Sequence, residues 1–91
     1  MTPASVAGVY HEPMSPDRVR ARRLQIAENI REARVGAGYT QEAASIRSGI
    51  SLDTYNRIEQ GHASPMLDTL IRIADGIGVR LSRFVREGDE E

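Results

Sequence analysis

The chain has 91 residues and no Cys, which leaves room for one small domain and excludes a disulfide framework or a zinc–thiolate site. No apolar run approaches the roughly 20 residues that a membrane span needs, and the N-terminus lacks the features of a signal peptide, so we expect a cytoplasmic protein with no membrane partner. The net charge is -1, but four of the 13 acids lie in residues 87–91, and without this segment the charge is +3. We therefore expect a mildly basic domain with an acidic tail at 87–91, a distribution compatible with phosphate contact.

Residues 1–14 are predicted to form a flexible arm, because they carry two prolines, Gly8 and no helical period. Their apolar residues could instead contact a partner subunit. Ser15-Pro16-Asp17 then marks a helix start, with a capping hydroxyl, a proline at the first helical position and an early acid.

A long first helix should follow and end at Gly36 and Gly38. Its apolar residues recur at intervals of seven, four and three, which predicts one buried face made by Val19, Ile26, Ile30, Ala33 and Ala37. The opposite face is charged and carries Arg18, Arg20, Arg22, Arg23, Glu28, Arg31 and Glu32. Two interpretations of the Arg-rich start remain open: a solvated helix face, or an additional phosphate contact beside a bound duplex.

Two short helices around a tight turn are predicted at about 40–47 and 51–60. Thr40 and Ser51 are suited to cap their N-termini, Gly49 permits the positive φ at which the first must stop, and Gly61 can end the second. Apolar contacts between them should come from Ala44, Ile50, Tyr55 and Ile58. A helix–turn–helix unit of this length typically presents its second helix to the major groove of DNA.

A fourth, strongly apolar helix should open at Pro65, with Gly76 and Gly78 loosening and closing its end. Its apolar residues are Met66, Leu67, Leu70, Ile71, Ile73, Ala74 and Ile77. A short fifth helix is expected over 81–85. Because no segment alternates like a strand, the sequence predicts an all-α fold, a compact five-helix domain over residues 15–86 with the helix-turn-helix at 40–60.

In order and spacing these elements resemble the Cro and phage-repressor type of helix-turn-helix, also called the xenobiotic-response-element family. The resemblance covers residues 24–86 and rests on Ile30 with Arg34, Thr40-Gln41-Glu42, Gly49-Ile50-Ser51, Tyr55-x-x-Ile58-Glu59-x-Gly61, Ser64-Pro65 and Ile77-Gly78-Val79-Arg80-Leu81. It implies a dimeric DNA-binding regulator with no cofactor, and a partly buried structural ion pair between Arg34 and Glu59. Leu52 and Asp53 depart from the family, whose members commonly carry amides, Arg or Ser there.

Docking of the second helix in a major groove would turn its first residues toward base edges. Arg57 suits a bidentate contact with guanine, Asp53 could accept from a cytosine amine, and Leu52 could touch a thymine methyl or instead pack onto the preceding helix. The groove-facing set is Ser51, Leu52, Asp53, Asn56 and Arg57. Further DNA contacts, mainly to phosphates, are predicted for Gln41, Thr54, Gln60, His62 and Ser64.

The expected dimer interface is the C-terminal apolar set Ile77, Val79, Leu81, Phe84 and Val85, although Phe84 could equally pack in the core. No metal site is expected, because His11 and His62 have no ligand partners nearby, and no residue pattern indicates an enzyme. The predicted function is a sequence-specific, dimeric transcriptional regulator, a repressor, that binds a double-stranded operator. Two alternatives share the same core: an antitoxin that masks a toxin and represses their promoter, and a restriction–modification controller.

Overall fold

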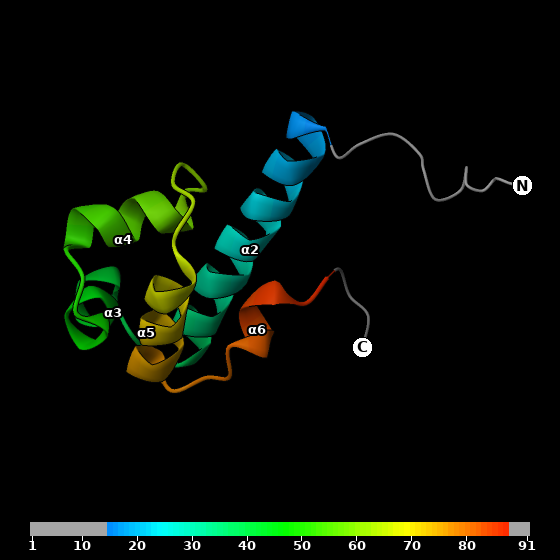
Figure 1. Cartoon of the computed structure of the whole chain (residues 1–91). Coiled ribbons are helices and arrows are strands. Elements are labelled where there is room, and N and C mark those ends of the chain that lie inside the picture. Colours follow the sequence, from blue (N-terminus) through cyan, green and yellow to red (C-terminus); the bar gives the residue numbers. More distant parts are fainter. Residues whose placement is uncertain (1–14, 88–91) are drawn as a thin grey trace, which may run out of the picture.

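The computed structural model describes residues 15–87, and this part of the chain holds five helices and no strand (Figure 1). They are α2 (Pro16–Gly36), α3 (Gln41–Ser48), α4 (Leu52–Glu59), α5 (Leu67–Ile77) and α6 (Ser82–Val85). The all-α prediction is therefore confirmed. The predicted arm at 1–14 and all but the first residue of the predicted tail at 87–91 lie outside the described residues. None of the described helices combines the length and apolarity needed to cross a membrane.

Side-chain caps begin the first three helices as predicted. Ser15 accepts a hydrogen bond from the backbone of Arg18, Thr40 from Ala43, and Ser51 from Thr54. Each cap satisfies one of the N–H groups that have no partner inside the helix, which is typically worth about 1 kcal/mol. The boundaries of these helices are therefore encoded locally.

All five helices contribute to a single core. The largest fully buried side chains are Ile30 from α2, Tyr55 from α4, Ile73 from α5 and Phe84 from α6, while Ala44 from α3 is also fully buried. In Figure 1, α3 and α4 lie on one side of the C-terminal half of α2, and α6 lies on the other. Burial of each large apolar side chain contributes roughly 1.5–3 kcal/mol, so tertiary packing stabilises α3 and α4, which are too short to be stable alone.

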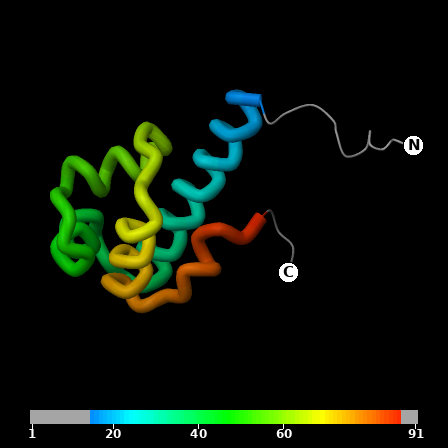
Figure 2. The backbone as a smooth tube through the Cα atoms, in the orientation of Figure 1, coloured from blue at the N-terminus to red at the C-terminus, as the bar shows by residue number. Residues whose placement is uncertain are grey.

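The first turns of α2 project past the other helices, which corrects part of the predicted buried face (Figure 2). Residues 15–22 are all exposed, and Val19 keeps 46% of its surface. Val19 borders a groove of about 220 Å³ whose walls include Ile26, Pro65 and Leu70. Ala37 is also exposed, because it caps the C-terminus of α2 and no longer belongs to a helical face.

The start of α5 also differs from the prediction. The helix begins at Leu67 and not at Pro65, with Met66 as an N-cap that makes no side-chain hydrogen bond. Met66 and Leu67 remain 71% and 62% exposed, because only residues further along α5 reach the core.

Gly76 allows α5 to approach α3 closely, a role that the predicted loosening of the helix end did not include. A Cβ atom on Gly76 would lie 2.9 Å from Ser48 Oγ and 3.0 Å from the carbonyl carbon and oxygen of Arg47. Arg47 Nε donates to the Gly76 carbonyl oxygen at 2.6 Å. The absent side chain therefore lets the two backbones meet.

Gly76→Ala should destabilise the domain by about 1–3 kcal/mol, because the Arg47 backbone cannot yield to the new methyl group. The matched control is Gly36→Ala at the end of α2, where nothing lies within 4 Å of the new Cβ and φ is not positive. That substitution should be neutral or stabilise by up to roughly 1 kcal/mol through helix propensity. Urea unfolding of both variants checks the opposite signs, and a Gly76→Ala variant as stable as Gly36→Ala would refute the close approach.

Candidate nucleic-acid interface

The α3–α4 pair has the geometry of a helix-turn-helix. Gly49 ends α3 with φ of 74°, and its N–H and that of Ile50 donate to the carbonyl oxygens of Ile46 and Ser45, each at 3.1 Å. Ser51 then caps α4, which begins at Leu52, three residues after Gly49. Tyr55 and Ile58 turn into the core, with 0% and 3% of their surface exposed, as predicted. The opposite edge of α4 is consequently left on the surface.

A buried carboxylate ties α4 to the two helices that precede it. Glu59 Oε2 accepts from Arg34 Nε at 2.8 Å and Oε1 accepts from Arg34 Nη2 at 3.1 Å, a bidentate pair between α4 and α2. Gln41 Nε2, at the start of α3, donates to the same Oε1 at 3.0 Å. The third arm of the guanidinium, Nη1, donates to the carbonyl oxygen of Tyr39 at 2.8 Å. The predicted pairing of Arg34 with Glu59 is thus present in the structure.

Both members of this pair are held in their charged forms. Burial alone would raise the pKa of Glu59, but the hydrogen bonds from Arg34 and Gln41 and the charge of Arg34 outweigh it and hold that pKa below the ordinary value. The hydrogen bond to Glu59 raises the pKa of Arg34 further, against the opposing effect of burial. The side chains of Arg34 and Glu59 are only 11% and 2% exposed, so the pair is shielded from solvent.

The exposed edge of α4 carries most of the residues predicted to face bases. Ser51, Asp53, Thr54 and Arg57 are exposed, and Leu52 keeps 41% of its surface. The Ser51 hydroxyl is committed to the cap and also bonds to the hydroxyl of Thr54 at 2.9 Å. This edge offers one cation, one carboxylate and an apolar side chain.

Asn56 sits less openly than its neighbours on α4. It is half-buried, and its Oδ1 is enclosed without a hydrogen-bond partner among residues 15–87. Of the predicted groove-facing residues it is therefore the least accessible.

The residues predicted to make further DNA contacts, mainly to phosphates, differ in how freely their side chains are exposed. Gln60, His62 and Ser64 are exposed around the end of α4. Gln41 is half-buried, and one N–H of its side-chain amide donates to Glu59. A phosphate at the start of α3 could therefore be met by the second N–H of that amide or by the backbone N–H groups there.

The residues of the C-terminal set predicted as a dimer interface differ in how far they are buried. Ile77 and Phe84 are 3% and 0% exposed inside the core of one chain, which matches the alternative of core packing considered for Phe84. Val79 and Leu81 pack partly against that core, and Val85 keeps 45% of its surface. Only the last three present surface to a second copy. Among the described residues, no three His, Cys, Asp or Glu side chains gather as metal ligands would.

Two polar residues of α2 have structural roles that the sequence interpretation missed. Asn29 Nδ2 donates to the carbonyl oxygens of Phe84 and Arg86, at 2.9 and 3.1 Å, and so attaches α6 to α2. Arg23 was expected on the charged face, but its Nε donates to the carbonyl oxygen of Gly61 at 3.1 Å. A signal existed for Asn29, because it lies three residues after Ile26 and four before Ala33, the spacings at which residues share the buried face.

Glu59→Gln should lower the free energy of unfolding at pH 7 by about 3 kcal/mol, because it leaves the Arg34 charge shielded from water without its partner. The wild-type carboxylate has a lowered pKa in the folded state, so its contribution is complete above the pKa of the unfolded chain and is lost as the pH falls through the folded value. The difference between the two proteins should accordingly narrow in acid.

Urea unfolding at neutral and acidic pH measures this difference. The control is Glu28→Gln, which removes an exposed pair with Arg31 on α2 and should change stability by no more than about 0.5 kcal/mol. Equal effects of Glu59→Gln and Glu28→Gln at neutral pH would show that the buried pair does not hold α4.

Comparison with known proteins places this geometry in a family. A sequence model of the helix-turn-helix family HTH_3 matches residues 30–84. The uncharacterized HTH-type transcriptional regulator y4dJ of Sinorhizobium fredii is 32% identical over 68 residues, which cover 75% of this chain and 88% of that protein.

Two solved structures share the fold. An HTH_3 family transcriptional regulator from Vibrio cholerae aligns with a TM-score of 0.68 and 31% identity over 71% of this chain, which spans only 36% of that protein. The restriction-modification controller protein C.AhdI from Aeromonas hydrophila has the same TM-score at 20% identity, over 70% of this chain and 97% of its own. The matched region contains the capped helix pair, the buried Arg34–Glu59 bond and the exposed edge of α4, and the chain belongs to the HTH_3 family of helix-turn-helix transcriptional regulators.

Proposed function

We propose that this protein is a sequence-specific regulator that represses transcription as a dimer, by placing α4 in the major groove of a double-stranded operator. The observation that carries the proposal is the exposed edge of α4 on a helix whose other side is buried and fixed by Glu59. A helix held from behind can enter a groove without paying the cost of ordering itself. Family membership supports DNA as the partner.

Arg57 is the best-placed residue on that edge to specify a base. It is exposed in the last turn of α4 and makes no ion pair with another residue in the 15–87 range. Its planar guanidinium matches the O6 and N7 acceptors that guanine presents in the major groove. Asp53 would add a preference for a cytosine amine, and Leu52 a contact with a thymine methyl.

Arg57→Ala should relax base preference at one position of the bound sequence, with a loss of about 1–3 kcal/mol of discrimination there. Selection of duplexes from a random pool, performed with the wild type and with the variant, measures this effect. Failure of the wild type to enrich any motif at low salt would refute the proposed function. If the variant instead loses the same affinity for every sequence, Arg57 contacts a phosphate and not a base.

Dimerisation is proposed to use the exposed remainder of the C-terminal apolar set. Val85 lies on α6, which Asn29 fixes to α2, and the partly exposed Val79 and Leu81 precede it on the same segment. Ile77 and Phe84 support this surface from the core and do not themselves present area to a partner.

Val85→Asp should shift the protein toward monomer, because a dimer would bury the new charge without a partner. The control is Val35→Asp on α2, a valine that is 55% exposed and outside this surface. Sedimentation equilibrium of the two variants and the wild type gives the test. A wild type that stays monomeric, or a Val85→Asp dimer as tight as that of Val35→Asp, would overturn the proposed interface.

The controller alternative rests on a similarity of fold alone. C.AhdI is described as a restriction-modification controller protein, but its identity to this chain is 20%. Transcriptional regulation, which the more similar relatives carry in their descriptions, therefore remains the main proposal.

A further inference from the structure

The first turns of α2 form a basic projection that the HTH_3 match does not include. That match begins at residue 30, whereas α2 begins at Pro16. The projection carries Arg18, Arg20, Arg22 and Arg23 within six residues, and residues 15–22 are all exposed. Because packing in the core does not explain a cluster of arginines on this projection, a binding role is favoured.

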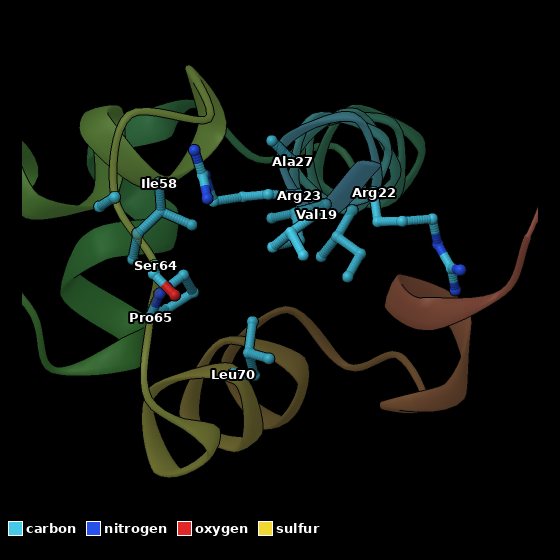
Figure 3. A pocket seen from close by; sticks show the side chains of 11 residues that line it. Val19, Arg22, Arg23, Ala27, Ile58, Ser64, Pro65 and Leu70 are labelled. Carbon is cyan, nitrogen blue, oxygen red and sulfur yellow. The ribbon is translucent and has the colours of Figure 1, made fainter. Parts of the chain in front are cut away.

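The four arginines leave α2 on two sides, and the contacts of Arg22 and Arg23 identify what each side faces. Arg23 reaches the loop after α4, where its Nε donates to the Gly61 carbonyl oxygen at 3.1 Å. Arg22 points to the other side, toward α6, where it pairs with Glu87. Figure 3 shows these two side chains diverging from the helix.

Arg20 belongs to the side of α2 that faces the loop after α4. It precedes Arg23 by three residues and Leu24 by four, the spacings at which helical residues share a face. Leu24 is the residue nearest to the position of a Cβ on Gly61, which confirms the direction of this side. Arg18 points away from it, by about 160° of rotation from Arg20 at 3.6 residues per turn.

The loop that Arg23 contacts borders the proposed DNA-reading edge. Gln60 and His62, on either side of Gly61, are exposed at the end of α4. This loop lies between α4 and the projecting turns of α2 (Figure 1), so a duplex that is seated on α4 and extends past the loop would reach those turns. Arg20 lies one turn further out than Arg23 and makes no ion pair with another residue between Ser15 and Glu87, so its guanidinium is available to an anion.

We propose that Arg20 binds a phosphate of the DNA backbone flanking the site read by α4, with Arg23 braced on Gly61 beside it. This inference rests on the proposed function and adds a contact outside the matched family region. Because a phosphate contact carries no base information, its effect should be the same on every sequence. Arg18, on the far side of the same helix, should take no part.

Arg20→Ala and Arg18→Ala form a matched pair, because both remove one exposed charge from the same helix. Fluorescence anisotropy monitors binding of each protein to the duplex selected by the wild type. Repeating the measurement over a range of salt concentrations gives the slope of log Kobs against log[salt]. Arg20→Ala should weaken binding and make that slope shallower by about 0.9, the value for one lost phosphate contact on B-DNA. Arg18→Ala should leave the slope unchanged.

The outcomes separate this inference from the proposed function. A wild type that selects a motif, combined with identical slopes for Arg20→Ala and Arg18→Ala, would overturn the Arg20 contact while leaving the regulator intact. Equal loss in both variants would likewise overturn it, in favour of general attraction by net charge. A wild type that selects no motif would instead refute the proposed function itself. Thermal unfolding of both variants should match the wild type.

Discussion

The ion pair between Arg34 and Glu59 fixes how the first three helices of this structure are arranged. One buried carboxylate receives donors from α2 and from the start of α3, so three helices meet at a single charged group. Helices of eight residues such as α3 and α4 are marginal by themselves, and their orientation depends on such tertiary contacts. Tyr55 and Ile58 anchor α4 in the apolar core, and the bonds of buried Glu59 fix the orientation of the helix.

This anchoring divides α4 into a structural side and an exposed edge. The groups that hold α4 in place lie behind it, whereas Leu52, Asp53 and Arg57 lie in front and take no part in the core. Substitutions on the exposed edge can therefore change the chemistry of that surface without altering how the protein folds. The departure of Leu52 and Asp53 from the residues common in this family occurs on the side where sequence change costs little stability.

Local chemistry made much of this fold predictable. The caps of Ser15, Thr40 and Ser51 and the positive φ of Gly49 depend on nearest neighbours, and all were readable in the sequence. Features that depend on distant partners were not. Val19 has the spacing of a core residue, but α2 extends beyond the helices that would cover it. The position of Gly76 near the end of a helix is explained in the sequence by its helix-ending tendency, whereas its close contact with the Arg47 backbone depends on the fold. Likewise, Gln41 has the position of a phosphate ligand, and only the fold shows that its amide also donates to Glu59.

We propose that the edge of α4 exposed by this anchoring is the surface that contacts DNA. It is tested most directly by NMR chemical-shift mapping of the protein titrated with the duplex that it selects. We expect the largest amide shifts at residues 51–57 and at the start of α3, with little change at α6. Large shifts confined to α5 and α6, with α4 unperturbed, would contradict it.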